Sequence, residues 1–166
     1  MFMPIKGAIV SDTTYVDNVL AAKDVSFTLP SLTAMTTDIP AMGTMTMPQW
    51  GLLEDMESSV TKIGVDLGFC SLVEPKTKTV EHRWIQTVTD ANGNTSQELC
   101  KAFLRCIPKV IPELSVELGS SIEADIPFAV TRYQLFVAGR EMVFADRLAG
   151  KLRVNGKDYS GITDQL

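Results

Sequence analysis

Tight-turn pairs set between β-type segments constrain the fold of this chain more than any other feature. The clearest case is Asn92-Gly93, which lies between residues 79–89 and residues 97–107, two segments rich in β-branched, aromatic and other apolar residues. Asn-Gly suits the positive φ angles of two-residue hairpin turns. A second pair, Asn155-Gly156, follows near the C-terminus. The sequence therefore predicts antiparallel strands joined by hairpins.

The N-terminal part repeats this pattern. Residues 8–17 end at the turn pair Asp17-Asn18, and residues 19–29 are predicted as one further strand. From Val25 to Leu29, apolar and polar residues alternate. That alternation is the period of a half-buried strand.

The rest of the chain adds strands and little helix. The sequence predicts strands at 56–66, 127–137 and 142–146, an exposed strand edge or loop at 113–125, and one short helix at 67–74. Many short strands with hairpin turns favour an antiparallel β-sandwich or barrel. We expect a mainly β fold with one short helix, in a single domain over residues 1–166, with residues 147–166 as a C-terminal arm.

The segment 97–107 is apolar on both of its faces. One face holds Cys100, Ala102, Leu104 and Cys106, and the other holds Leu99, Lys101, Phe103, Arg105 and Ile107. A strand with apolar residues on both faces is expected to be covered on both sides.

Residues 36–53 are the least typical segment. Pro40, Gly43, Pro48 and Gly51 are expected to interrupt any regular element, which leaves an extended loop. Loops are usually polar because they face water. This one carries Ile39, Met42, Met45, Met47, Trp50, Leu52 and Leu53, and five of the eight methionines fall within 22 positions. A long apolar loop either folds over its own domain or inserts into a partner.

Composition excludes several classes of protein. The chain has 166 residues, of which 45% are hydrophobic and 21% charged, so it can bury a core and is not disordered. Its net charge of −5 argues against a sequence-independent nucleic-acid binder. Between Arg132 and Asp158, however, basic residues outnumber acidic ones. That excess fits an acidic protein neighbour as well as it fits a nucleic acid.

No motif indicates catalysis. The nucleophile-elbow, phosphate-loop and dinucleotide-binding patterns are missing from the sequence. The lone histidine, His82, is expected to pack beside an aromatic residue or lie at a strand surface, and Cys100 and Cys106 are expected in the core. The acidic runs at 54–57 and 113–125 lack the spacing of a calcium loop. We therefore predict no catalytic residue, no metal site and no cofactor, and we expect a protein that is not an enzyme.

Signals for targeting are weak. The first ten residues are apolar but lack a basic start and a long apolar stretch, so no secretory signal is expected. No window approaches 18 consecutive apolar residues, so no membrane-spanning helix is expected. Synthesis in a reducing cytoplasm follows as the default for three unpaired cysteines.

Several short motifs occur in an order typical of a known family. Residues 133–146 hold a strand, a Gly-Arg-Glu hairpin and a second strand that closes on Asp146, and Arg153-Val-Asn-Gly-Lys-Asp158 follows. Earlier, Tyr15-Val-Asp-Asn18 precedes Val25-Ser-Phe-Thr-Leu-Pro30, and the Gly/Met-rich stretch 41–48 comes next. In this order the motifs resemble the major tail tube proteins of P2-like contractile-tailed phages. The helix at 67–74 is shorter than is common in that family, and the end of the chain, 159–166, is shorter and less charged.

The resemblance implies a structural subunit without chemistry of its own. In such proteins hexameric rings form, the sheets join into a ring-shaped barrel, and the rings stack into a hollow tube. The implied partners are a sheath protein outside, baseplate and tail terminator proteins at the ends, and the tape measure protein and DNA in the lumen. The implied location is the virion tail of a phage, or a phage-tail-like particle such as a contractile bacteriocin, assembled in the cytoplasm of the bacterial host.

The tube interpretation gives the apolar segment a role. Packed against the next ring, it would place Ile39, Met42, Met45, Met47 and Trp50 in an inter-ring contact, where flexible methionine side chains fill an imperfectly matched gap. The alternative is a lid over the protein's own core. Net negative charge also suits a DNA conduit, because an acidic lumen repels phosphate.

A second class of function stays open at this stage. A β-sandwich virion accessory or binding module would need a cleft or an aromatic platform. Trp50, Trp84 and three tyrosines are the candidates for such a platform, and they do not cluster in the sequence.

Overall fold

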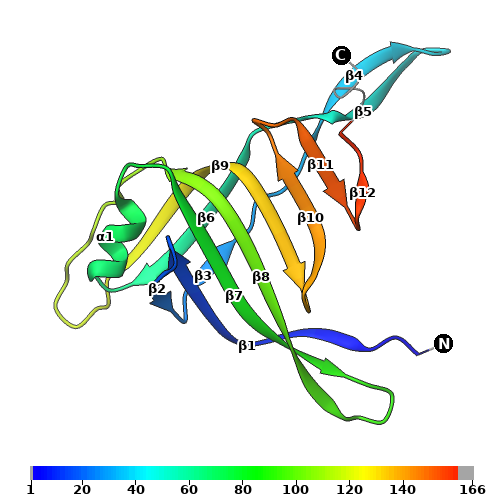
Figure 1. The fold of residues 1–166 in the computed structure, drawn as a ribbon. Helices are drawn as coiled ribbons and strands as arrows, with labels where there is room; N and C mark the ends of the chain where they lie inside the picture. Colours follow the sequence, from blue (N-terminus) through cyan, green and yellow to red (C-terminus); the bar gives the residue numbers. More distant parts are fainter. Residues whose placement is uncertain (1, 161–166) are drawn as a thin grey trace.

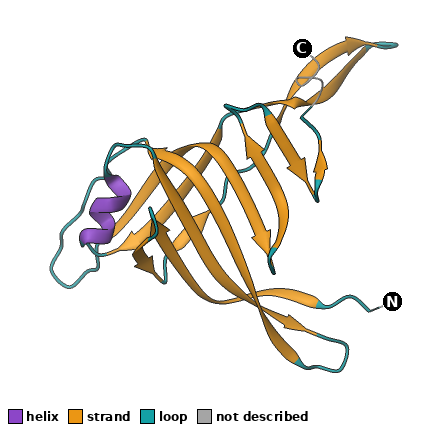
Figure 2. Cartoon of the chain, in the orientation of Figure 1, coloured by secondary structure: helices purple, strands orange, loops and turns teal. Residues whose placement is uncertain are grey.

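Antiparallel strand pairing organises residues 2–160, the part of the chain that the computed structural model describes. In Figure 2 strands dominate and a short helix lies at one end of the molecule. The elements in chain order are β1 (Ile5–Val16), β2 (Val19–Lys23), β3 (Ser26–Thr28), β4 (Ala34–Pro40), β5 (Thr44–Leu53), β6 (Met56–Ile63), α1 (Leu67–Val73), β7 (Lys78–Thr89), β8 (Thr95–Pro108), β9 (Glu123–Val137), β10 (Arg140–Asp146), β11 (Lys151–Val154) and β12 (Lys157–Asp158). The predicted mainly β, antiparallel fold with one short helix is confirmed.

The main sheet is curled and divides at β9. Its strand order is β12-β11-β10-β9-β8-β7-β1-β2. On the edge of β9 that faces away from β8, residues 123–130 pair with β6, whereas residues 132–137 pair with β10. The strand β3 pairs with β6 and extends this branch of the sheet by one strand. Because β2 and β3 also follow each other in the chain, the two ends of the sheet approach each other on the far side of the core (Figure 1). The result is a half-open barrel with β10, β11 and β12 extending from it.

The predicted turns are present. Asp17 and Asn18 have φ angles of 48° and 67°, and Asn155 and Gly156 have 53° and 77°. At the long hairpin the Asp90 carboxylate accepts hydrogen bonds from the backbone N–H groups of Asn92 and Asn94, both at 2.9 Å. In this hairpin Gly93 has a φ of 78°, whereas Asn92 has no positive φ. Left-handed backbone is what Asn, Asp and Gly tolerate best.

The single strand predicted over residues 19–29 is wrong, because the chain is interrupted at Asp24. Asp24 has a φ of 52°, which separates β2 from β3. The break is held from β1, where the Asp12 carboxylate accepts a hydrogen bond from the Val25 backbone N–H at 3.1 Å. The predicted alternation within 25–29 is confirmed, since Val25 is buried and Ser26 and Thr28 are exposed.

The expectation that prolines and glycines exclude regular structure from residues 36–53 is also wrong. These residues form most of β4 and β5, a separate two-stranded hairpin. Both strands of such a sheet are edge strands, where proline is tolerated because one side of the strand needs no donor. Pro40 ends β4, and Gly43, with a φ of 121°, lies in the turn.

The strand predicted at 97–107 is covered on one face only within this chain. Cys100, Ala102, Leu104 and Cys106 are each no more than 1% exposed, as expected. On the opposite face Leu99, Arg105 and Ile107 are exposed. The prediction of cover on both sides therefore fails within one subunit.

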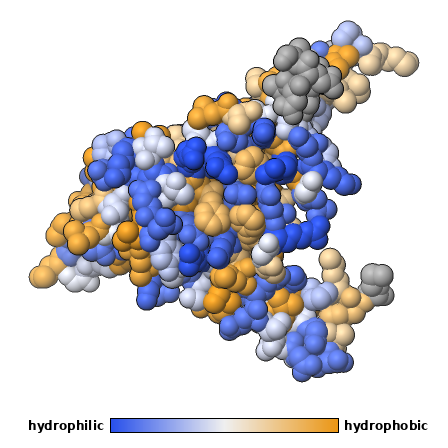
Figure 3. Space-filling view, viewed as in Figure 1, coloured by the Kyte–Doolittle hydropathy of each residue, from blue (hydrophilic) through white to orange (hydrophobic). Residues whose placement is uncertain are grey.

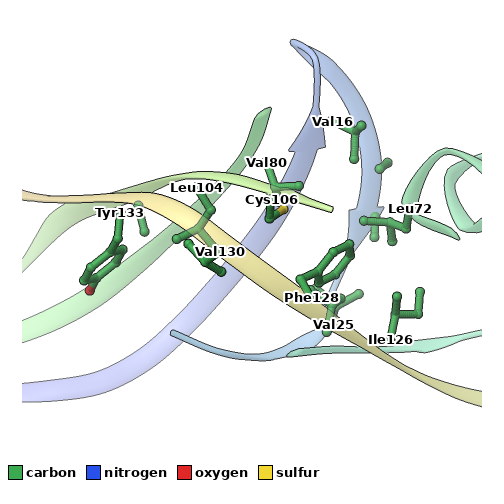
Figure 4. Packing of buried hydrophobic residues seen from close by; sticks show 14 of the residues in the cluster. Val16, Val25, Leu72, Val80, Leu104, Cys106, Ile126, Phe128, Val130 and Tyr133 are labelled. Atoms are coloured by element: carbon green, nitrogen blue, oxygen red, sulfur yellow. The ribbon is translucent and has the colours of Figure 1, made fainter. Parts of the chain in front are cut away.

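The core lies inside the curl of the sheet. Figure 4 shows side chains from β1, β7, β8, β9 and α1 pointing toward one another, among them Val80, Leu104, Phe128 and Leu72. Burial of such side chains contributes about 1.5–3 kcal/mol each relative to exposure. This packing holds the curled sheet and the helix together.

The helix α1 is fixed at both ends. The Asp66 carboxylate caps its N-terminus by accepting a hydrogen bond from the Phe69 N–H at 2.9 Å. This hydrogen bond lowers the pKa of Asp66. At the other end the buried Lys78 ammonium donates to the carbonyl oxygens of Ser71 and Leu72. A cation at the C-terminus of a helix satisfies carbonyls that have no partner in the helix.

The C-terminal segment continues the sheet. Within the segment 147–166, which the sequence suggested as an arm, β11 pairs with β10 and β12 pairs with β11. Residues 161–166 of that segment lie outside the described residues.

His82 packs in the core beside an aromatic ring, as predicted. Its ring stacks on Phe27 with centroids 4.2 Å apart, and its Nδ1 lies 2.9 Å from the Thr14 hydroxyl. The Nε2 atom has no hydrogen-bond partner among the described residues. Burial lowers the pKa of His82 to about 3.

We expect His82 to make the protein acid-sensitive. The unfolded chain takes up a proton near pH 6.5, whereas the folded protein does so only near the lowered pKa, so folding loses about 1.4 kcal/mol per pH unit as the pH falls between these values. Urea unfolding of the wild type and His82→Gln at pH 7 and pH 5 tests this. The wild type should lose about 2 kcal/mol more than the variant over this range. Equal losses would contradict the assignment.

Candidate assembly site

The hairpin of β4 and β5 is amphipathic. In its register Ile39 lies opposite Met45 and Thr37 lies opposite Met47. Directly opposed residues of an antiparallel pair point to the same side. This side therefore holds Met35, Ile39, Met45 and Met47 together with the polar Thr37 and Gln49, and we call it the apolar face. The other side carries Thr36, Asp38, Thr44 and Thr46.

The tip and the base of the hairpin are well defined. At the tip the Ala41 N–H donates to the Gly43 carbonyl at 2.8 Å, and Met42, with a φ of 53°, is fully exposed. At the base the Glu54 N–H donates to the Thr33 carbonyl at 2.9 Å. These bonds close the two ends of the β4–β5 ladder, and at the base Ala34 is buried and Leu53 packs against the core.

Trp50 lies apart from the methionines. Pairing passes from Met35–Gln49 to Ala34–Leu53, so residues 50–52 bulge out of β5. There Trp50 lines a shallow cleft with Arg147 and Leu152, next to the turn between β10 and β11. It belongs to the base of the hairpin.

The hairpin projects from the body of the protein (Figure 1). Every residue from Met35 to Leu52 is exposed. The alternative of a lid over the protein's own core is therefore not what the structure shows. Contiguous exposed apolar side chains on a soluble protein mark a surface for a partner.

The structure brings together three of the five residues that the sequence singled out. Ile39, Met45 and Met47 share the apolar face, Met42 lies at its tip, and Trp50 lies at the base. Met35 completes the face and was not singled out. A strand-like period of two across 35–39 and 45–49 is the signal that would have found it.

A second surface lies on the solvent side of β7, β8 and β9. We call it the basic face and define it by Arg83, Lys101, Arg105 and Arg132. Figure 3 shows strongly hydrophilic groups gathered over these strands, with apolar surface between them. Arg83 Nε donates to Glu81 at 2.6 Å, and this bond raises the pKa of Arg83.

The buried Cys106 thiol is poorly placed to act as a nucleophile. Burial raises the pKa of the Cys106 thiol to about 12, which makes it a poor nucleophile at neutral pH. Residues 2–160 contain no group of three or more His, Cys, Asp or Glu side chains placed to hold a metal ion. In the same range no helix has the length and hydropathy needed to cross a bilayer.

The structure is that of a mainly β, antiparallel protein with a projecting apolar hairpin. The family model described as phage tail tube protein FII matches residues 8–161. The chain therefore belongs to this family of phage tail tube proteins, as the order of its motifs indicated. The protein is a structural subunit of the tail tube type.

Comparison with solved structures gives the same fold. A chain in the sheath–tube complex of an extracellular contractile injection system, PVC, in the extended state, is similar with a TM-score of 0.50. The two chains are 12% identical, and the match covers 75% of this chain and 87% of that one. At this identity the likeness concerns the fold. No curated protein matches the sequence.

Proposed function

We propose that the protein assembles into hexameric rings that stack into the inner tube of a contractile phage tail or a phage-tail-like particle. The tube serves as a conduit for DNA during injection, or as a puncturing tube in a particle without DNA. Membership of the tail tube family supports this proposal. The fold shared with a chain of a sheath–tube complex is consistent with it.

The observation that carries the proposal is the uncovered apolar face of the hairpin. A fully buried methionine contributes about 1.5–3 kcal/mol relative to an exposed one. Leaving Met35, Met45 and Met47 in water is unfavourable for a subunit that stays alone. Packing of this face against the next ring removes the apolar surface from water. We therefore infer that the face, which includes Ile39, forms the inter-ring contact. Met42 extends that contact at the tip and Trp50 at the base.

Open strand edges support the joining of sheets around a ring. Residues 5–12 of β1 pair with β7 on one side, and among the described residues no strand pairs with their other side. At the opposite end of the sheet order, β12 is also an edge. Unpaired edges attract further strands. A ring of copies would pair such edges and leave none open.

The remaining partners follow from the same proposal. A sheath protein would surround the tube, and baseplate and tail terminator proteins would close its ends. The tape measure protein and DNA would occupy the lumen in turn. The assembled tube would lie in the virion tail or the phage-tail-like particle, after assembly in the cytoplasm of the bacterial host.

Native mass spectrometry of the purified protein tests the ring. We expect complexes whose masses are multiples of six times the chain mass of 18.2 kDa. The fraction of these complexes should rise with protein concentration, because association is a mass-action equilibrium. A monomer at every concentration, or rings of another copy number, would contradict the hexamer.

A further inference from the structure

Two pairs of like charges lie directly opposite each other on the basic face. Arg105 of β8 is the register partner of Arg132 of β9, and Arg83 of β7 is the partner of Lys101 of β8. Directly opposed like charges destabilise an antiparallel sheet. An isolated subunit therefore carries an unfavourable arrangement here, which a negatively charged partner would relieve.

The acidic groups of this chain neutralise only part of that charge, although Asp146 of β10 is the register partner of Arg132 on the other side of β9. Glu81 pairs with Arg83. Among the described residues, Lys101, Arg105 and Arg132 form no ion pair; the Arg132 guanidinium lies over the Phe144 ring, 5.1 Å from its centroid. A ring face attracts a cation but does not cancel its charge.

An apolar depression adjoins these charges. Phe103 and Phe136 meet edge to face with ring centroids 5.8 Å apart, and with Leu99 they line a shallow pocket. Phe103 also borders the neighbouring pocket that holds Arg105 and Arg132. The basic face is thus suited to a segment that carries acidic and apolar side chains side by side.

The loop between β8 and β9 has this composition. Residues 109–122 include Glu113 and Glu117, and the apolar Leu114, Val116 and Leu118 are exposed next to them. Past Lys109 the loop contains no basic residue. A loop of this length without strand or helix is uncommon in a compact domain and is usually functional. In Figure 1 it lies beside α1 at one end of the body.

We propose that the loop 109–122 of one subunit docks on the basic face of a second copy. Its glutamates meet Arg105 and Arg132, and its apolar side chains occupy the depression formed by Phe103 and Phe136. The contact joins two different surfaces of the same protein, and repeated contacts of that kind close a ring when the rotation permits. The inference rests on the proposed self-assembly and names a contact within it.

Nucleic acid is the other polyanion that a basic face attracts. Two observations favour the loop. The phosphodiester groups of a nucleic acid carry no apolar group that could fill the depression. The chain as a whole carries a net charge of −5, which repels DNA. DNA binding is therefore one outcome of the charge-reversal experiment.

Charge reversal with rescue tests the contact. Arg105→Glu with Arg132→Glu, and separately Glu113→Lys with Glu117→Lys, should each raise the concentration needed for assembly about tenfold or more, as expected when close charge pairs at an interface become repulsive. All four substitutions in one chain should return that concentration to within about threefold of the wild type, because opposite charges face each other again. Sedimentation velocity measures it.

A matched control changes the same number of charges elsewhere. Lys76→Glu with Lys23→Glu changes two exposed lysines outside the basic face and should assemble like the wild type. If the two reversal variants also assemble like the wild type, or if the combined variant is not rescued, the contact is wrong. If the wild type retains a DNA duplex that Arg105→Glu with Arg132→Glu releases, while assembly is unchanged, the face binds DNA and the inference is overturned.

Cross-linking separates failure of this contact from failure of the tube. Subunits with Glu117→Cys are mixed under oxidising conditions with subunits carrying Gln134→Cys, both with Cys70→Ser. A disulfide-linked dimer is expected, and its absence overturns the docking whether or not tubes form. Tubes without the cross-link contradict this contact alone, whereas a wild type that never assembles contradicts the proposed function.

Discussion

Met45→Asp combined with Met47→Asp is expected to abolish assembly and to leave a folded monomer. Both side chains lie on the apolar face of a hairpin that does not pack on its own core, so the body of the protein loses nothing. An inter-ring contact would lose the burial of two methionines, about 3 kcal/mol or more in total. That loss raises the concentration needed for assembly by about 100-fold or more. Sedimentation velocity and circular dichroism measure assembly and folding separately.

The same hairpin provides the control. Thr36→Asp with Thr44→Asp adds two carboxylates to the polar side of the same two strands. This variant should assemble much more readily than the methionine variant. If both variants assemble like the wild type, the apolar face is not a contact. If the methionine variant fails to fold, the hairpin belongs to the core.

Gly68→Ala is expected to cause a large loss of stability although it adds a single methyl group. A Cβ atom at this position would lie 1.8 Å from the Ala21 carbonyl oxygen of β2. Because that oxygen belongs to the backbone, α1 has to move away from the sheet and loses part of the packing of Phe69 and Leu72. Overpacking of this kind costs about 1–3 kcal/mol, and the backbone contact places the cost at the upper end.

Thermal unfolding checks this prediction. A loss of about 3 kcal/mol lowers Tm by about 6–12 °C in a domain of this size. Cys70→Ala is the control, since Cys70 lies on the same helix and is exposed; its Tm should stay close to that of the wild type. Equal Tm values for wild type and Gly68→Ala would show that the helix approaches the sheet less closely.

Local patterns explain how much of the fold was predictable. Turn pairs such as Asn155-Gly156 carry their own backbone preference, and the alternation around Leu104 reflects one buried face. For these elements the local sequence and the global fold agree. The break at Asp24 depends on a hydrogen bond from β1, a contact distant in sequence, so no local signal indicates it.

The candidate site was predictable in its residues but not in its geometry. The apolar character of 36–53 is evident, but Pro40 and Pro48 argue for a loop unless the segment is known to form a two-stranded sheet. Strand register then decides that Met35 joins Met45 and that Trp50 does not. Register cannot be obtained without knowing which strands pair.

The distribution of charge shows the same limit. The net charge of −5 suggested an acidic lumen, and that remains a prediction. The cross-strand pairs of Arg105 with Arg132 and of Arg83 with Lys101 emerge only from the pairing of β7, β8 and β9. A face with this charge is suited to a contact between subunits. It is poorly suited to line a channel through which DNA passes, because it would bind phosphate.

Electron microscopy of the purified, concentrated protein tests the central claim most directly. The account predicts hollow rings with sixfold symmetry that stack into tubes. In these tubes the β4–β5 hairpin of each ring should lie against the adjacent ring. A monomer that forms neither rings nor tubes at high concentration, or a tube in which the hairpin faces solvent, would contradict it.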